Sequence, residues 1–432
     1  MSKAIVDEKC EVLLWDEPLG LLVKKEGRYF FQFHPKAKIS PSPIMVPLEV
    51  NRTFAFPDAS FGLPGFIRDY IPGQYGQEVV KKYYKNNPTI IEMLCFVGDR
   101  GVGAISFKPQ TASLEKRTIK AVEAYLKDRE KLEKNYEDEA LIGAVVRGSA
   151  QDGARPKIFC AIHKDSDEIV VNYGKQEPLP DGYRHIILKF DEHYNKEKRA
   201  HEKTVNDSHE QVLEYIYSIL AKELGIVMPK TGLLKTKDSG TWFWAERFDI
   251  PLDGQIPHVH TFAGLIHDRS SLWESSYEEL CRTALELGCS HADIEQIYKL
   301  MVFNIVFGNV DDHSRNFSFI MSKRGKWTFA PAYDLTPASA DIGESNHLKV
   351  FEKAPFRQAL VSADASREDL EDFANLFGIK GASEIIEHTC NLATNKLPLL
   401  MKEFDIERRI DETIKKIRNF ASIDGFPKGV KP

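Results

Sequence analysis

The segment from Phe307 to Phe319 carries polar residues whose types and spacing suit phosphoryl transfer. Asp311 and Asn316 stand in the D-x-x-x-x-N spacing of a protein-kinase catalytic loop. In that chemistry an aspartate orients the substrate hydroxyl and accepts its proton, and an amide oxygen a few residues later binds Mg²⁺. The spacing therefore predicts a kinase-type catalytic loop at this point of the chain.

A further oxygen donor, Asp334, follows this loop after a predicted β-hairpin. The aromatic and apolar runs 317–320 and 327–329 flank the turn Lys323-Arg324-Gly325-Lys326, which indicates two paired strands. An aspartate just after such a hairpin can bind the metal ion that bridges nucleotide phosphates. A loop capped by Asp and Asn side chains, without chemistry, explains each residue alone but does not explain their order.

A glycine-rich stretch over 143–157 lies between two apolar runs upstream of the loop. Glycines allow backbone N–H groups to approach phosphate oxygens closely, and the neighbouring Arg and Lys residues add positive charge. The segment Gly98–Gly103 is also glycine-rich, but it lacks the Walker lysine and no helix follows it. We therefore predict a tight hairpin turn there and a nucleotide loop in 143–157.

Three features follow the glycine-rich stretch in the order used by a protein-kinase N-lobe. Lys189 lies in the apolar strand predicted over 186–190, and Glu214 lies on a helix that a Ser208-x-x-Gln211 capping box begins. The aromatic strand 242–249 then ends in a polar, hinge-like connection. Taken singly, the lysine fits the wet face of an edge strand, and the glutamate fits an ordinary surface position.

Candidates for other chemistry are fewer. His258 and His260 could offer two metal ligands on one strand face, but no third ligand stands at a recognised spacing. The six cysteines are scattered without a CxxC pair, which predicts reduced thiols in the core of a cytosolic protein.

The elements that must position these residues fall into four segments. Residues 1–112 form a β-rich N-terminal domain of short aromatic and aliphatic strands, and 113–140 form a charged, helical connection. Residues 141–250 form a kinase N-lobe, and 251–432 a mainly helical C-lobe whose strongest helix runs from His291 to Phe307. We expect an α+β, protein-kinase-like bilobal fold preceded by a small β-rich domain.

Composition excludes several classes of protein. The 432 residues are 42% hydrophobic and 28% charged, which suits a globular core rather than disorder. No run of 18 apolar residues is present, and the N-terminus lacks the apolar region of a secretion signal, so we expect neither membrane spans nor secretion. The net charge of −6 argues against non-specific nucleic-acid binding, although a local basic patch can be hidden in that average.

The sequence resembles the HipA-like toxin kinases of bacterial toxin–antitoxin systems. Three segments carry the resemblance: Gly153-Ala154-Arg155-Pro156-Lys157, then Gly308-Asn309-x-Asp311-Asp312-His313-x-x-Asn316-Phe317-Ser318, and Ala330-Pro331-x-Tyr333-Asp334. The run Leu220–Gly225 resembles the end of the family's N-lobe helix, and Gly62–Pro72 is similar to a segment of its N-terminal domain. The resemblance covers nearly the whole chain, and the catalytic-loop segment is its most specific part.

The resemblance implies a role for each candidate residue. Asp311 would be the catalytic base, and Asn316 and Asp334 would be the Mg²⁺ ligands. The ATP-binding residues would be Gly148, Gly153 and Lys157 of the glycine-rich segment, Lys189 with its ion-pair partner Glu214, and the backbone of Glu246 and Phe248 at the hinge. Ser149 would be the autophosphorylated serine. Val310 in place of His-Arg, and Tyr333-Asp334-Leu335 in place of Asp-Phe-Gly, argue against an activation-loop switch of the eukaryotic type.

The resemblance also implies an ATP- and Mg²⁺-dependent serine/threonine kinase that arrests growth in the bacterial cytoplasm. Its substrate would be a translation component such as an aminoacyl-tRNA synthetase. A DNA-binding antitoxin would neutralise it, DNA would be contacted only through that antitoxin, and a homodimer could form within the complex. A lipid or small-molecule kinase is the first alternative, although no basic amphipathic membrane stretch is present. A catalytically silent module of a repressor complex is the second.

Overall fold

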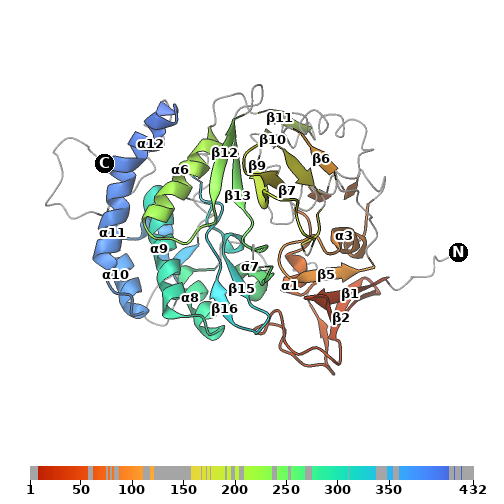
Figure 1. The fold of residues 1–432 in the computed structure, drawn as a ribbon. Helices are drawn as coiled ribbons and strands as arrows, with labels where there is room; N and C mark the ends of the chain where they lie inside the picture. The colour runs from red at the N-terminus through yellow and green to blue at the C-terminus, as the bar shows by residue number, and fades with distance from the viewer. Residues whose placement is uncertain are drawn as a thin grey trace. The chain divides into compact units, whose positions relative to one another are not determined.

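The computed structural model contains two compact units (Figure 1). Unit 1 comprises Met1–Val212, Pro229–Ser271 and Arg315–Ala330, and unit 2 comprises Leu213–Met228, Leu272–Ser314 and Pro331–Pro432. The structure describes residues 8–56, 62–73, 76–77, 80–81, 87–109, 117–120, 157–166, 168–171, 173–175, 177–189, 192–195, 200–203, 209–235, 241–251, 254–267, 275–309, 311–336, 348–353, 360–407, 413 and 420.

Unit 1 begins with an antiparallel sheet in the strand order β4-β3-β2-β1-β5. Its strands are β1 (Glu8–Leu14), β2 (Glu17–Lys25), β3 (Arg28–Phe33), β4 (Thr53–Ala55) and β5 (Ile105–Lys108). The short strands predicted here are confirmed and pair as hairpins, and both residues between β1 and β2, Trp15 and Asp16, have positive φ angles. Positive φ at both central residues gives a turn the twist that matches two antiparallel strands.

The glycines of Gly98–Gly103 do not form the predicted hairpin turn. The residues before them form helix α3 (Ile90–Val97), which begins with a capping box between Thr89 and Glu92, and the residues after them enter β5. A short apolar run bounded by glycine fits a buried helix as well as a strand, so its periodicity was a poor guide. The helix begins where two side chains satisfy its first N–H groups.

A second sheet of unit 1 has the strand order β12-β13-β9-β7-β8-β6. Its strands are β6 (Arg117–Ile119), β7 (Lys157–His163), β8 (Ile169–Val171), β9 (Tyr183–Lys189), β12 (Thr231–Lys235) and β13 (Thr241–Glu246). Directly after β9 in the sequence, β10 (Glu192–Asn195) pairs with β11 (Ala200–Lys203) as a two-stranded ribbon. The helix predicted to include Ile119 is wrong at that residue, because β6 pairs with β8 there; 121–140 lie outside the described residues.

The described part of unit 1 also contains two short helices and a third sheet. They are α1 (Gly65–Arg68), α7 (Phe262–Leu265), β14 (His258–Thr261), β15 (Ser318–Met321) and β16 (Trp327–Phe329). The hairpin predicted after the candidate catalytic loop is confirmed as β15 and β16. Gly65 allows α1 to lie against α7, because a Cβ atom there would be 1.9 Å from the Gly264 carbonyl oxygen.

Unit 2 is mainly helical. The helices whose bounds the structure describes are α6 (Glu210–Glu223, whose first turn belongs to unit 1), α8 (Tyr277–Glu286), α9 (His291–Phe307), α10 (Arg367–Leu376), α11 (Ala382–Asn391) and α12 (Leu397–Glu403). Strands β17 (Lys349–Phe351) and β18 (Leu360–Val361) form a small hairpin, Ser314–Asn316 and Ser362–Asp364 form 3₁₀ turns, and Leu392–Lys396 form a π turn. Among the described helices, none is long and apolar enough to cross a membrane.

The ends of α6 and α9 follow from their sequences. The helix predicted from His291 to Phe307 is confirmed as α9: Ser290 caps it through a capping box with Asp293, and Gly308 ends it with a left-handed φ of 65°. Gly225 ends α6 in the same way with a φ of 79°, whereas Ser208 lies outside the described residues. Glycine is favoured at such helix ends because it adopts this backbone conformation without a Cβ clash.

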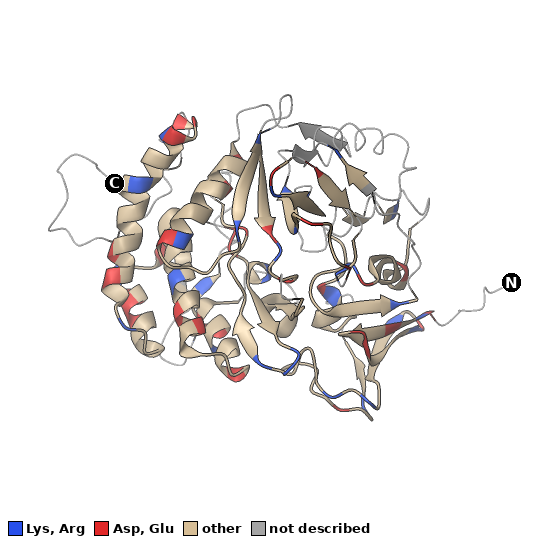
Figure 2. Cartoon of the chain, in the orientation of Figure 1, with Lys and Arg blue, Asp and Glu red and all other residues tan. Residues whose placement is uncertain are grey.

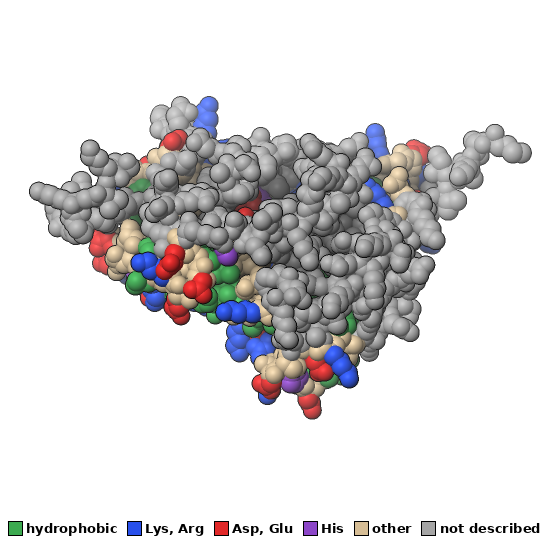
Figure 3. Space-filling model, turned by 90° about the horizontal axis from the view of Figure 1, so that it is seen from above, with side chains coloured by type: hydrophobic (Ala, Val, Ile, Leu, Met, Phe, Trp, Pro, Cys, Tyr) green, Lys and Arg blue, Asp and Glu red, His purple; other side chains and the backbone are tan. Residues whose placement is uncertain are grey.

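All six cysteines are buried free thiols, which confirms that they belong to the core. On the surface, acidic and basic side chains are interspersed along the helices of unit 2 (Figure 2). On the face drawn in Figure 3, Lys and Arg side chains also gather in one place.

Candidate active site

The predicted catalytic loop places two adjacent carboxylates in different environments. After Gly308 ends α9, the Asp311 side chain is 39% exposed, and its Oδ1 lies 3.9 Å from His313 Nε2. The next residue, Asp312, is 1% exposed. Asp311 can therefore meet a substrate from solution, whereas Asp312 is part of the interior of unit 2.

A chain of buried hydrogen bonds holds Asp312. Tyr277 at the start of α8 donates its hydroxyl to Asp312 Oδ2 at 2.5 Å, and Asn304 Nδ2 donates to the Tyr277 hydroxyl at 2.9 Å. Asn309 Nδ2 in turn donates to Asn304 Oδ1 at 3.0 Å. Burial, and next the Asp312 carboxylate, raise the pKa of Tyr277 well above its usual value, so the phenol remains a donor. The network anchors the loop to α8 and α9.

One candidate metal ligand, Asn316, ends this loop, and the other, Asp334, follows it. Asn316 ends the 3₁₀ turn Ser314–Asn316 and is half-buried, as is Asp334. Asp334 has a φ of 59°, which is uncommon outside glycine but is tolerated by Asp and Asn. Two residues earlier, the Ala332 N–H donates to the Val227 carbonyl at 2.8 Å, which fixes the chain leading to Asp334.

In unit 1 the sheet brings two candidate lysines together. Lys157 and Lys189 lie directly opposite each other on β7 and β9, so their side chains leave the same face of the sheet. Lys157 is 6% exposed, and Lys189 Nζ lies 5.8 Å from the centre of the Phe243 ring. Because β9 lies between β7 and β13, Lys189 is not on an edge strand.

Glu214 is not an ordinary surface glutamate, since its residue is 3% exposed in α6. The hinge candidates lie at the end of β13: the Glu246 N–H donates to the Lys230 carbonyl at 2.7 Å, and Phe248 is half-buried two residues later. Gly148, Ser149 and Gly153 lie outside the described residues.

A buried ion pair lies among the hinge candidates, just after the end of β13. Arg247 donates to Asp249 Oδ2 at 2.6 Å, and the Gly103 N–H donates to the same oxygen at 2.8 Å. Burial alone would raise the pKa of Asp249, but Arg247 and these hydrogen bonds lower it overall. The pair thus joins the end of β13 to the glycines that precede β5.

Comparison with known families decides the identity of the chain. The model of the HipA-like C-terminal domain matches residues 149–397, and that of the HipA N-terminal domain matches residues 10–108. The chain belongs to the HipA-like family. The sequence resemblance is therefore confirmed.

Individual HipA-like relatives are distant. A protein named "Putative kinase" from Haemophilus influenzae is 23% identical over 236 residues, which is 50% of this chain and 67% of that protein. Toxin YjjJ of Escherichia coli is 27% identical over 202 residues, which is 46% of this chain but 40% of YjjJ. The match thus spans less than half of the YjjJ toxin.

A solved structure shows the HipA-like fold. The structure of the Shewanella oneidensis toxin–antitoxin system HipA, HipB and its operator DNA aligns with 94% of this chain and 95% of that chain. The TM-score is 0.63 at 16% identity. The predicted α+β, kinase-like fold class is confirmed by this likeness and by the sheets and helices described above.

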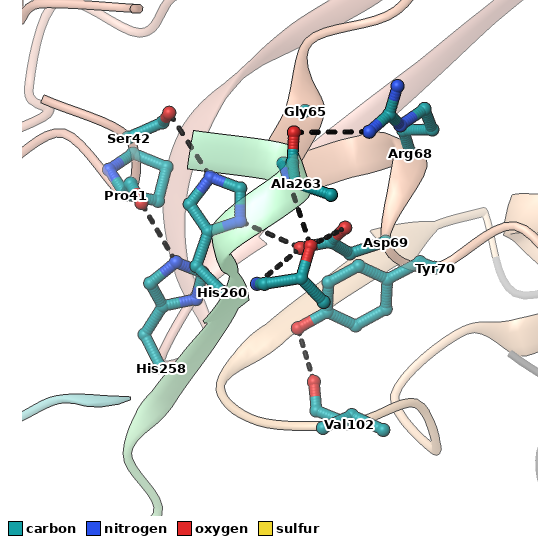
Figure 4. A network of polar contacts seen from close by, with 12 residues as sticks. Pro41, Ser42, Gly65, Arg68, Asp69, Tyr70, Val102, His258, His260 and Ala263 are labelled. Carbon is teal, nitrogen blue, oxygen red and sulfur yellow. Dashed lines mark hydrogen bonds and ion pairs between the residues drawn. The ribbon is translucent and has the colours of Figure 1, made fainter. Parts of the chain in front are cut away.

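The HipA-like chain uses His258 and His260 in a buried network of unit 1 (Figure 4). His260 Nδ1 lies 2.7 Å from Asp69 Oδ2, and His260 Nε2 lies 3.1 Å from Ser42 Oγ. His258 Nε2 donates to the Pro41 carbonyl at 2.9 Å. Ser, His and Asp occur in the order of a hydrolase triad, but Ser42 and His260 are 0% exposed, so no substrate reaches them. The network instead ties three distant segments together.

This network predicts acid lability. Burial, and next the neighbouring His260, lower the pKa of His258 to about 3, below the unfolded value of about 6.5. Below about pH 6.5 the unfolded chain therefore binds a proton at this imidazole, whereas the folded chain does not. The free energy of unfolding consequently falls as the pH drops below about 6.5. We expect a loss of about 1.4 kcal/mol from this group at pH 5.5, one unit below that value.

The measurement is the urea midpoint at pH 7.5 and pH 5.5, for the natural chain and for His258→Gln, whose amide keeps a donor without titrating. Burial also lowers the pKa of His185 to about 4, so some pH dependence should persist in the variant. An identical pH dependence in both proteins would show that His258 does not contribute.

Proposed function

We propose that this HipA-like chain is an ATP- and Mg²⁺-dependent serine/threonine protein kinase that acts as the toxin of a toxin–antitoxin pair. The observation that carries the proposal is the different exposure of two adjacent aspartates in the loop. Asp312 is buried on Tyr277, while Asp311 is 39% exposed at the position of a kinase base. We assign Asp311 to orient the substrate hydroxyl and accept its proton.

The nucleotide-binding assignments agree with local chemistry. Lys157 and Lys189 are directly opposed on one sheet face, so they place two positive charges together. We assign these charges to the α and β phosphates of ATP, with Glu214 as the ion-pair partner of Lys189. The Glu246 N–H already donates to Lys230, so we assign its carbonyl, together with the Phe248 backbone, to adenine.

Asn316 and Asp334 offer an amide oxygen and a carboxylate, the hard donors that suit Mg²⁺ shared with substrate phosphates. When bound, Mg²⁺ would neutralise charge on those phosphates. We further propose a DNA-binding antitoxin as partner, by analogy with the complex of HipA with HipB and operator DNA. A translation component such as an aminoacyl-tRNA synthetase would be the substrate, in the bacterial cytoplasm.

Autophosphorylation tests this function directly. After incubation with ATP and Mg²⁺, we expect mass spectrometry to find phosphate on Ser149, and the Asp311→Asn protein to lack it. A phosphate adds about −1.5 to −2 charges to a loop meant to cover the nucleotide phosphates, so ATP affinity should fall. Transfer to lipid or small-molecule acceptors, with none to protein serine or threonine, would contradict the protein-kinase assignment.

A further inference from the structure

A group of basic side chains that has no role in the proposed catalysis lies on unit 1. We call it the basic surface, and it consists of the exposed residues Lys36, Lys38, Lys323, Arg324 and Lys326. The loop that follows β3 supplies the first two, and the turn between β15 and β16 supplies the others. In Figure 2 the lower end of that hairpin is blue.

The two segments are in contact. A Cβ atom added to Gly325 would lie 2.8 Å from Ile39 Cδ1, so the hairpin turn packs on the loop. Every member of the basic surface lies within three residues of Gly325 or Ile39 in the sequence. A hydrogen bond also fixes this loop to the third sheet: His258 on β14 donates to the Pro41 carbonyl, and β14 pairs with β15. The cations are therefore gathered by tertiary structure.

None of these five side chains forms an ion pair with any residue that the structure describes. Other cations of unit 1 do so: Arg52 lies 3.0 Å from Glu49, and Lys24 lies 3.8 Å from Glu8. Neighbouring like charges raise the free energy of the free surface, and an anionic partner lowers it. The whole chain has a net charge of −6, so this surface has the opposite sign of charge to the chain as a whole.

We propose that the basic surface binds the phosphodiester backbone of a nucleic-acid duplex. A duplex carries one negative charge per about 1.7 Å of its axis, so a group of exposed cations can contact several phosphates at once. Lysine predominates here, and lysine binds phosphate as a point charge without reading bases, so binding should be independent of sequence. This surface would let the chain touch DNA or RNA itself, rather than only through an antitoxin.

The test uses the full chain and fluorescence anisotropy with a labelled 20-base-pair DNA duplex and an RNA duplex of the same sequence. We expect affinity to fall with salt, with a slope of log K against log salt of about −4 to −5 for five contacts. The double variant Arg324→Gln with Lys326→Gln should flatten that slope by about two. The matched control is Arg28→Gln with Lys25→Gln, which removes one Arg and one Lys from another exposed hairpin turn of unit 1.

The control variant should bind like the natural chain, and both variants should keep their unfolding midpoint. Binding of either duplex or of both supports the proposal. If the two affinities differ, the tighter duplex shows whether DNA or RNA is the preferred partner. An Arg324/Lys326 variant that binds as tightly and as salt-sensitively as the control would overturn it. Polyglutamate bound as tightly as the duplexes would also overturn it, since the partner would then be an acidic protein.

Discussion

Replacing Asp311 with Asn should lower the rate of phosphoryl transfer by about 10²- to 10⁴-fold, the usual contribution of a general base, with little change in ATP affinity. The amide keeps the size of the carboxylate but cannot accept the substrate proton. Because the side chain is 39% exposed, its loss should leave the unfolding midpoint nearly unchanged. Single-turnover transfer from labelled ATP, with ATP affinity measured in parallel, checks both halves of the prediction.

The neighbouring carboxylate provides the contrast. Tyr277→Phe removes the hydroxyl that donates to the buried Asp312, and a buried acceptor that loses its donor costs about 1–3 kcal/mol. The main effect of Tyr277→Phe should be a lower free energy of unfolding. Its rate of phosphoryl transfer should fall less than that of Asp311→Asn, and only because the loop is less firmly held. If instead Asp311→Asn retained full activity while Asp312→Asn lost it without destabilisation, the roles of the two aspartates would be reversed.

Replacing Asp334 with Asn should raise the Mg²⁺ concentration needed for ATP binding by about tenfold or more, since changes around a metal site commonly cost 10- to 100-fold. Asn is the appropriate substitution because, like Asp, it tolerates the φ of 59°, whereas Ala would add backbone strain. Asn316→Ala should shift the Mg²⁺ requirement in the same direction. Titrating Mg²⁺ at fixed ATP measures the shift.

Asp405 offers a matched control for Asp334. It is also an aspartate of unit 2 with a positive φ, 58°, but it is exposed at the end of α12. Asp405→Asn should leave the Mg²⁺ titration unchanged, which separates the loss of a ligand from the loss of a charge. If the Mg²⁺ titration curves of the Asp334 and Asn316 variants coincided with those of the Asp405 variant and the natural chain, this metal site would be ruled out.

The sequence by itself determined those features whose causes are local. The hairpins of the first sheet follow from short apolar runs and the turns between them, and α9 follows from its Ser290 cap and Gly308 end. The order of the kinase-like motifs and the HipA-like family were also readable, because each motif is a short contiguous pattern. The same dependence on short range explains the errors at Gly98–Gly103 and Ile119, where a helix cap and a distant strand partner decide the structure.

Only the tertiary structure decided which residues share an environment. Asp311 and Asp312 are adjacent and chemically alike, and they differ because α8 places Tyr277, 35 residues away in sequence, where its hydroxyl donates to the buried Asp312. Likewise, Lys157 and Lys189 become opposed because β7 and β9 are paired. Burial and charge proximity depend on contacts between distant segments, and a pattern read along one stretch of chain does not contain them.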